Sequence, residues 1–508
     1  MRYVASREEM QNIDAYSINN VGIPGIVLME KAALALEEVF LERIPTDSRV
    51  LIVTEKGNNG GDGLALGRLL LEEGYTVDFY EIGVIQHDSD SHQIQKHILE
   101  QMEADFLMKF PDEEYDVIVD AIFGVGLKRE VAGRHREVIE RLNQMEALKV
   151  AVDVPSGVDA SAGQILGIAF EADITVTFGL PKVGLLLYPG ADVSGEVIVK
   201  EIGFPNKAVE EIAPQMVSFT TDDLELLPER KAWTNKGSYG KVLLIAGSKN
   251  MAGAALLSGT AAYKSGSGLV RIFSCEENRV ILQEKLPEAI LTTYDSEEKA
   301  WELLPESLSW ASVIGIGPGI GQSAFASKLV KQVLTLGKAP LVIDADGLNN
   351  LAALLQEDTE LRQLFHEYEG GMILTPHLKE MSRLTGEEIA EIRSNLPKAA
   401  ASTADKGHVI VLKDARTIVS DGSVPSYINM SGNNGMATGG SGDVLTGIIC
   451  GFLAGGLDIL TAARLGVYCH GLAGDAAAKE KGYYSVLAGD LPNYLETILK
   501  RKHFPEEI

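Results

Sequence analysis

The stretch from Gly439 to Asp443, Gly-Gly-Ser-Gly-Asp, places one acid behind small residues and ahead of an apolar run of helical length. Bare backbone N–H groups at the start of a helix bind phosphate. A carboxylate facing that phosphate is placed to accept the proton of an attacking hydroxyl. The stretch therefore predicts transfer of a phosphoryl group to an alcohol, with Asp443 as the base. The structural alternative is a glycine-rich turn before a buried helix, because short motifs of this kind often match by chance.

Three segments in the first half of the chain combine glycines with oxygen-bearing side chains, and each follows an apolar run of strand length. They are 57–63 (GNNGGDG), 120–127 (DAIFGVGL) and 153–159 (DVPSGVD). Ligands of open α/β sheets bind beyond the carboxyl ends of the strands, so we expect these loops to converge on one site. The alternative is that their polar residues only cap the following helices.

The side-chain oxygens in these loops suit a hard, weakly hydrated cation. Asn59, Asp120 and Ser156 offer an amide oxygen, a carboxylate and a hydroxyl, and such oxygen atoms are the ligands of hard cations. The loops hold no histidine or cysteine, which disfavours a transition metal. This mixed, weakly charged set predicts potassium at the three residues. Asp153 remains as a candidate for proton transfer.

The elements that must position the first-half loops are short apolar runs separated by helical stretches. Runs that are continuous rather than alternating are typical of strands buried on both faces of a parallel sheet. Helices are expected at Gly63–Glu73 and Arg134–Glu146, with Ile26–Glu42 before the first strand. This order predicts a Rossmann-like, doubly wound α/β domain. The expected strands are Val50–Thr54, Val77–Tyr80, Val117–Ala121, Val150–Val154, Ile174–Phe178 and Val197–Ile202.

A second strand series follows Pro214–Pro228, a segment that has turn residues and no strand pattern. The series ends with a helix at Gly442 and another at Ile459–Glu480. We therefore expect two α/β domains, at about 1–220 and 225–508. The expected strands of the second are Val242–Ala246, Leu269–Phe273, Val313–Ile316, Leu341–Asp344, Met372–Thr375 and Val409–Leu412.

Composition limits the partners of this chain. With 45 basic and 72 acidic side chains, its 508 residues carry a net charge of −27, which disfavours nucleic acid and anionic membranes. Cys275, Cys450 and Cys469 fit neither a disulfide framework nor a zinc site, and we expect reduced core residues. No apolar run approaches the roughly 20 residues of a membrane span, and the N-terminus lacks an apolar signal core. A cytoplasmic homo-oligomer that acts on small molecules is expected.

The three first-half loops, together with Leu28-Met29-Glu30-Lys31-Ala32, resemble the NAD(P)H-hydrate epimerase family. The resemblance implies potassium at Asn59, Asp120 and Ser156. One departure is Glu55-Lys56-Gly57, where the family often has Gly-x-Gly, and the Glu55 side chain is expected to crowd the loop. The implied hydrate contacts are Asn58, Asn59, Gly60, Gly61, Asp62, Gly124, Val125, Gly126, Leu127, Lys128, Arg129, Glu130 and Asp153.

The second half resembles the ribokinase-like superfamily and, within it, the ADP/ATP-dependent NAD(P)H-hydrate dehydratases. Departures are Asn235, where many relatives have histidine, and Leu378-Lys379-Glu380, where Pro-Gly-Glu is usual. The matching segments are 236–242, 246–248, 317–321, Asp344-Ala345-Asp346, Thr375-Pro376-His377 and 439–443. The implied substrate contacts are Ala254, Gly319, His377 and Asp443, and the implied nucleotide contacts are Lys413, Asp414, Ala415, Arg416, Thr417 and Gly442. A lone histidine such as His377 is more often structural.

Both sets of motifs together resemble the bifunctional NAD(P)H-hydrate repair enzymes. That resemblance implies an N-terminal domain that interconverts the R and S hydrates of NADH and NADPH. It implies a C-terminal domain that phosphorylates the S hydrate with ADP or ATP and Mg²⁺, then eliminates phosphate, giving NAD(P)H, AMP and phosphate when ADP is used. Two alternatives stay open: a vitamin or sugar kinase with a ligand-sensing N-terminal domain, and an N-terminal interaction module with a vestigial site.

Overall fold

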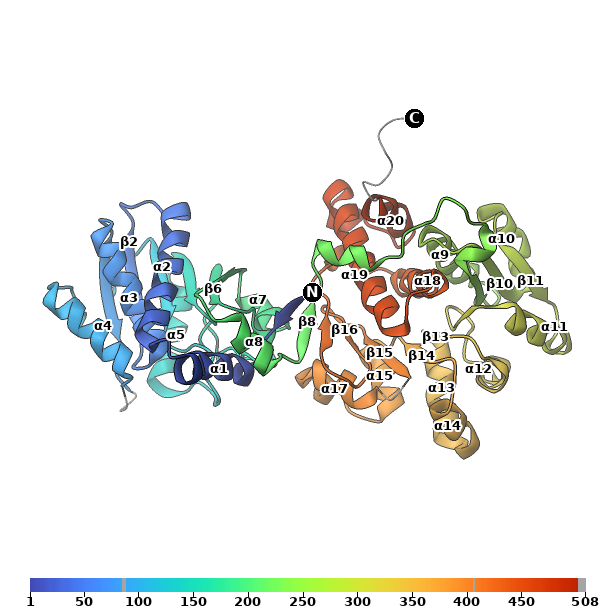
Figure 1. The fold of residues 1–508 in the computed structure, drawn as a ribbon, viewed down its shortest axis with the longest axis horizontal. Helices are drawn as coiled ribbons and strands as arrows, with labels where there is room; N and C mark the ends of the chain where they lie inside the picture. Colours follow the sequence, from blue (N-terminus) through green and yellow to red (C-terminus); the bar gives the residue numbers. More distant parts are fainter. Residues whose placement is uncertain (85–87, 405–406, 501–508) are drawn as a thin grey trace. The chain divides into compact units, whose positions relative to one another are not determined.

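The computed structural model describes residues 1–84, 88–404 and 407–500 (Figure 1). Its internal contacts divide the chain into two compact units. Tyr3–Met216 form the N-terminal unit, and Met1–Arg2 with the chain from Val217 onward form the C-terminal unit. The last residues of the expected second domain, 501–508, lie outside the described residues.

The described part of the N-terminal unit contains a six-stranded sheet in the order β3-β2-β4-β5-β6-β7. Every neighbouring pair in it is parallel, so the expected parallel, doubly wound sheet is confirmed. The strands are β2 (Arg49–Thr54), β3 (Thr76–Glu81), β4 (Val117–Ala121), β5 (Leu148–Val152), β6 (Ile174–Phe178) and β7 (Glu196–Lys200).

Helices cover both faces of this sheet because alternate strand residues are apolar on each side. On one face Val50 and Ile52 share a core with Leu36 of α2 and Leu64 of α3. On the other face Leu51 of the same strand packs with α5. The helices are α1 (Arg7–Tyr16), α2 (Gly25–Arg43), α3 (Asn58–Glu72), α4 (Asp90–Gln101), α5 (Gly133–Gln144), α6 (Val183–Leu186), α7 (Gly190–Val193) and α8 (Asn206–Ile212).

Helix α3 begins at Asn58, five residues before the expected start at Gly63. The prediction that 57–63 form a loop is therefore wrong from Asn58 onward. The reason is close packing: a Cβ on Gly60 would lie 2.0 Å from the carbonyl oxygen of Glu55. Glycine lets the first turn approach the end of β2, although its helix propensity is low.

The second sheet has eleven strands in the described residues, in the order β1-β8-β17-β16-β15-β14-β13-β12-β9-β10-β11. It is parallel from β15 to β11, while β16 and β17 are antiparallel. The expected strands are present, as β9 (Lys241–Ile245), β10 (Leu269–Cys275), β12 (Val313–Ile316), β13 (Leu341–Ile343), β14 (Met372–Leu374) and β15 (His408–Leu412).

Sequence patterns missed the strands at the margins of this sheet, and the expectation of no strand in Pro214–Pro228 is wrong. Most of these strands have only three residues, which is too short for a periodic signal. They are β1 (Arg2–Val4), β8 (Met216–Ser218), β11 (Ile290–Tyr294), β16 (Ile418–Ser420) and β17 (Ser426–Ile428).

One face of the second sheet packs against α9, α18, α19 and α20 in a large apolar core. The buried thiols of Cys450 and Cys469 belong to this core. Cys275 is buried and free as well, so the expectation of reduced core cysteines is confirmed. The helices are α9 (Ala252–Lys264), α10 (Arg279–Lys285), α11 (Glu297–Trp310), α12 (Ala324–Leu336), α13 (Asp346–Glu357), α14 (Thr359–His366), α15 (Leu378–Thr385), α16 (Ile389–Ser394), α17 (Leu396–Thr403), α18 (Ser441–Ala454), α19 (Ile459–Lys481) and α20 (Leu491–Leu499).

Each sheet has a point at which the strand order reverses direction. Strand β2 lies between β3 and β4, and β9 lies between β10 and β12. The loops beyond β2 and β4, and those beyond β9 and β12, diverge at these points and leave room for a ligand. Within the described residues, no helix has the length and apolar character needed to cross a bilayer.

Candidate active sites

A cavity of about 610 Å³ opens at the reversal point of the N-terminal sheet. All of its lining residues belong to the N-terminal unit. It brings together most of the expected hydrate contacts, while Gly60, Gly61 and Glu130 do not line it. The expected contacts that do line it are Asn58, Asn59, Asp62, Gly124, Val125, Gly126, Leu127, Lys128, Arg129 and Asp153.

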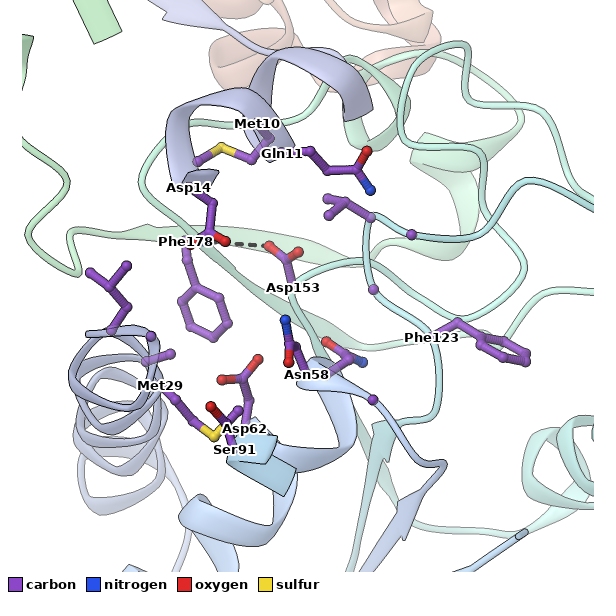
Figure 2. A pocket seen from close by; sticks show the side chains of 18 of the residues that line it. Met10, Gln11, Asp14, Met29, Asn58, Asp62, Ser91, Phe123, Asp153 and Phe178 are labelled. Carbon is purple, nitrogen blue, oxygen red and sulfur yellow. Dashed lines mark hydrogen bonds between the residues drawn. The ribbon is translucent and has the colours of Figure 1, made fainter. Parts of the chain in front are cut away.

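The most constrained group in the cavity is Asp153, which follows β5 and has a left-handed backbone (φ +68°). Its Oδ1 accepts hydrogen bonds from Lys182 Nζ (2.6 Å), Thr177 Oγ1 (3.0 Å) and, more weakly, the N–H of Phe178 (3.4 Å; Figure 2). Its Oδ2 accepts no hydrogen bond from the part of the chain that the structure describes. One carboxylate oxygen is therefore anchored and the other is left for a ligand.

Lys182 is fully buried and donates to three acceptors, which requires the ammonium form. The acceptors are Asp153 Oδ1, Thr177 Oγ1 at 2.8 Å and the carbonyl of Phe178 at 2.8 Å. Burial lowers the pKa of Lys182, and the charge of Asp153 partly offsets this effect. Sequence reasoning missed this lysine, which follows β6, the strand adjacent to β5.

Two further carboxyl groups, Asp14 of α1 and Asp62 of α3, line the same cavity (Figure 2). Burial, together with the charges of Asp153 and Asp14, holds the pKa of Asp62 well above its usual range. Burial and the charge of Asp153 also raise the pKa of Asp14. Sequence reasoning missed Asp14, which lies in a polar helix without any motif.

The expected potassium ligands lie beside the cavity rather than in its lining, apart from Asn59. Asp120 and Ser156 are fully buried, and Ser156 donates to Asp120 from Oγ at 2.6 Å and from its N–H at 2.7 Å. Burial raises the pKa of Asp120 to about 6. Asn59 Oδ1 faces Gly124, where an added Cβ would lie 2.8 Å away, and Asn59 Nδ2 is buried without a partner in the described chain.

Glu55 does not crowd the glycine segment, so that expectation is wrong. Its Oε2 accepts from the N–H of Val84 at 3.1 Å and lies 2.7 Å from His135 Nε2. The fully buried side chain is thus held away from the cavity. Its neighbour Lys56 lines the cavity, as do the expected contacts Lys128 and Arg129.

At the reversal point of the C-terminal sheet, two of the expected substrate contacts meet. Gly319 has a left-handed backbone, and an added Cβ would lie 2.9 Å from Cβ of Ala254. The loops beyond β9 and β12 are joined by backbone hydrogen bonds from Gly247 to Pro318 (2.9 Å) and from Ser248 to Gly319 (2.6 Å). The structure therefore brings Ala254 and Gly319 together on a rigid backbone.

A second cluster lies where α18 begins. Lys413 Nζ donates to Asp344 Oδ1 at 2.7 Å, and a Cβ added to Gly442 would lie 3.2 Å from that nitrogen. Asp344 also accepts from Thr375 (2.7 Å) and Thr446 (2.9 Å). Burial would raise the pKa of Asp344, but the ammonium and the hydroxyls outweigh it and hold that pKa below its usual value. Sequence reasoning noted Asp344 only as part of a segment that resembles the dehydratases and gave it no role.

Asp443 lies in the first turn of α18, as its motif predicted. Gly440 caps the helix with φ +94°, and an added Cβ there would lie 2.5 Å from Leu257 Cδ1. Burial and the nearby charge of Asp344 raise the pKa of Asp443 to about 6, although Lys413 opposes the shift. A carboxylate with this pKa is ionised at neutral pH and is a better proton acceptor than an exposed aspartate.

His377 caps α15 and pairs in register with Lys413. Its Nδ1 accepts from the N–H groups of Lys379 and Glu380, both at 3.1 Å. Burial and the charge of Lys413 lower the pKa of His377. The ring thus has a structural role, and half of it is exposed beside the cluster at α18.

The remaining expected nucleotide contacts follow Lys413 in a turn between β15 and β16. The Arg416 guanidinium donates to the carbonyl of Met430 at 3.3 Å. The carbonyl of Thr417 accepts from Asn429 at 2.9 Å. Asp414 and Ala415 lie between Lys413 and Arg416 in the sequence, and Lys413 joins this segment to the cluster at α18.

Comparison with known proteins gives the family of both halves. A family model described as NAD(P)H-hydrate dehydratase matches residues 242–497, and a model of the YjeF-related protein N-terminus matches residues 25–184. The crystal structure of a ribokinase-like superfamily protein from Enterococcus faecalis has a TM-score of 0.50 with 32% identity. That similarity covers 56% of this chain and 95% of the E. faecalis chain.

Curated relatives match the chain over nearly its whole length. The bifunctional NAD(P)H-hydrate repair enzyme of Thermofilum pendens is 36% identical, covering 98% of this chain and 96% of the relative. The corresponding enzyme of Moorella thermoacetica is 38% identical, and the match covers 98% of this chain and 97% of the relative. The chain therefore belongs to the bifunctional NAD(P)H-hydrate repair enzymes, which combine an epimerase and a dehydratase in one polypeptide.

Proposed function

We propose that the cavity of the N-terminal unit is the epimerase site and that Asp153 exchanges the proton there. The observation that carries this proposal is the arrangement of Asp153, with Oδ1 anchored by a buried ammonium and Oδ2 unpaired beside the cavity. An anchored carboxylate is a suitable base for the C6 hydroxyl of a hydrated nicotinamide ring. Lys56, Lys128 and Arg129 provide positive charge for the phosphates of the dinucleotide.

We propose that the cluster at α18 is the dehydratase site. Asp443 takes the proton of the C6 hydroxyl, and the oxygen attacks the terminal phosphate of the nucleotide. The backbone N–H groups of Gly439, Gly440 and Gly442 and the Lys413 ammonium stabilise the charge on the transferred group. Phosphate then leaves more readily than hydroxide would, which restores the dihydropyridine ring of NAD(P)H. Ala254, Gly319 and His377 are the proposed contacts of the hydrate.

The nucleotide is proposed to be ADP or ATP, held by residues 413–417 and Gly442. Lys413 meets its phosphates because its nitrogen lies at the backbone of the first turn of α18. Mg²⁺ bound to those phosphates would neutralise part of their charge. The short distance between the first turn of α18 and the Lys413 nitrogen supports this proposal.

Potassium is proposed to bind at Asn59, Asp120 and Ser156. The fit rests on Asp120, a fully buried carboxylate with no ion-pair partner in the described chain. A monovalent cation would neutralise this charge, and the Asn59 amide and Ser156 hydroxyl supply further oxygens. A crystal grown in potassium should show anomalous scattering there, and Asp120→Ala should lose epimerase activity. An empty site with full activity in the variant would contradict the proposal.

A fragment ending at Met216 tests the assignment of the N-terminal cavity. It contains the complete parallel sheet and every lining residue, so it should fold and interconvert the R and S hydrates without nucleotide. Chromatography of the two hydrates measures the rate, with the rate in buffer subtracted. A fragment that is folded by circular dichroism but inactive would show that the epimerase site needs residues beyond Met216.

A further inference from the structure

The cavity of the N-terminal unit is lined by two carboxyl groups besides that of Asp153. Asp62 and Asp14 line it together with Asp153, and Figure 2 shows the three carboxyl groups around one space. Asp62 projects from the first turns of α3, the helix that also places Asn58 and Asn59 in the lining. A second carboxyl group therefore faces the same space as Asp153.

Asp153 and Asp62 lie in different electrostatic environments, because only Asp153 has an ion-pair partner among the described residues. The ammonium of Lys182 uses its three hydrogens on Asp153, Thr177 and Phe178, so it is paired with Asp153 and has none left for another carboxylate. Asp62 makes no hydrogen bond or ion pair among the described residues. Burial without a partner disfavours the charged form of a carboxyl group, and the nearby charge of Asp153 disfavours it further. Both effects favour the neutral acid form of Asp62, which has a proton to donate.

Resting on the epimerase function proposed above, we propose that Asp62 is the second catalytic residue of epimerisation, a proton donor that works opposite Asp153. A pair of carboxyl groups with different environments can serve as acid and base at the same pH. Asp14 is the less suitable donor because it lies on α1 and not on the turn of α3 that carries Asn58 and Asn59.

The proposed reaction balances without any co-reactant. Asp153 accepts the proton of the C6 hydroxyl, the oxygen forms a carbonyl with C6, and the C6–N1 bond breaks. The bond electrons go to N1, which receives the proton of Asp62. Rotation about the C5–C6 bond presents the other face of the carbonyl to N1. The C6–N1 bond then forms again while N1 returns its proton to Asp62 and Asp153 returns its proton to the oxygen.

The test compares three variants of the full chain, Asp62→Asn, Asp153→Asn and Asp14→Asn, by epimerisation in the absence of nucleotide. Asp62→Asn should lower kcat by about 10²–10⁴-fold, the usual effect of losing one general acid or base. Its KM should stay close to that of the unchanged protein, and titration calorimetry with hydrated NADH should still show binding, which verifies a folded cavity. Asp14→Asn, the matched control in the same cavity, should lower kcat much less than Asp62→Asn does.

The pH profile separates proton donation from a structural role. A donor must be protonated, so activity should fall as pH rises through the pKa of Asp62, and this alkaline limb should be absent in Asp62→Asn. Equal losses in Asp62→Asn and Asp14→Asn, or an unchanged alkaline limb, would overturn the assignment of Asp62. Full activity in Asp153→Asn would instead show that the epimerase site itself lies elsewhere.

Discussion

The two units of this protein use the same pair of residues in opposite orientations. In the N-terminal unit the lysine of the Asp153–Lys182 pair is fully buried and the aspartate side chain is 12% exposed. In the C-terminal unit the aspartate of the Asp344–Lys413 pair is 1% exposed and the lysine is 21% exposed. One site thus presents a carboxylate, which suits proton exchange, and the other presents an ammonium, which suits a phosphate. The exposed member of the pair distinguishes the proposed chemistry better than the reversal in strand order, which both units share.

Exchanging the two proposed proton acceptors for amides gives the largest expected effect and the strongest test of this separation. Asp153→Asn should lower epimerisation, and Asp443→Asn should lower dehydration of the S hydrate, each by about 10²–10⁴-fold. Each variant should keep the other activity, and nucleotide should still bind to Asp443→Asn. NADH formation with nucleotide and chromatography of the hydrates without it measure the two activities. Loss of both activities in either variant would mean that the sites are not independent.

Replacing the buried lysine tests whether the N-terminal pair also stabilises its unit. Lys182→Met leaves Asp153 without its ion-pair partner, which typically costs about 3–5 kcal/mol in the free energy of unfolding. Hydrogen exchange followed by mass spectrometry should show faster exchange in β5 and β6, with the C-terminal unit unchanged. The exposed Lys109 provides the control, since Lys109→Met should change stability by less than about 0.5 kcal/mol. Equal exchange in both variants would contradict the stabilising role.

The pH dependence of dehydration tests the C-terminal pair. The pKa of Asp443 is about 6, and a base must be ionised, so kcat should fall as pH drops below about 6. Asp344→Asn removes a nearby negative charge that raises this pKa, so the acid limb should move to lower pH. Asp295→Asn, at an exposed position of the same unit, should leave the profile in place. An acid limb that stays near 6 in Asp344→Asn would show that the two carboxylates are not coupled.

The smallest expected effect concerns the positive charge beside the N-terminal cavity. Lys56→Ala should raise the KM for the hydrates a few-fold with little change in kcat, because a partly exposed cation contributes about 1 kcal/mol or less. The increase in KM should be larger for hydrated NADPH, which carries one more phosphate than hydrated NADH. Lys109→Ala serves as the control. A change confined to kcat would place Lys56 near the reacting ring rather than near the phosphates.

The sequence predicted which residues lie together in the candidate sites better than it predicted their packing. Asp443, Asp153 and the asparagine–glycine segment were identified because their residue types follow strands or begin helices. Lys182 and Asp14 were not identified from the sequence, because no local pattern marks a residue whose neighbours in the site lie far along the chain. The early start of α3 escaped for a related reason: low helix propensity at Gly60 is overridden by contact with the end of β2.

The left-handed backbone of Asp153 has a consequence for how this protein can lose a function. Aspartate, asparagine and glycine are the residues that adopt such a conformation with little strain, and each of the last two is a single base change away from aspartate in the genetic code. Either substitution keeps the backbone conformation but removes the carboxylate, and it leaves the buried Lys182 ammonium without its ion-pair partner. Stability and the N-terminal activity would therefore both select for the acid.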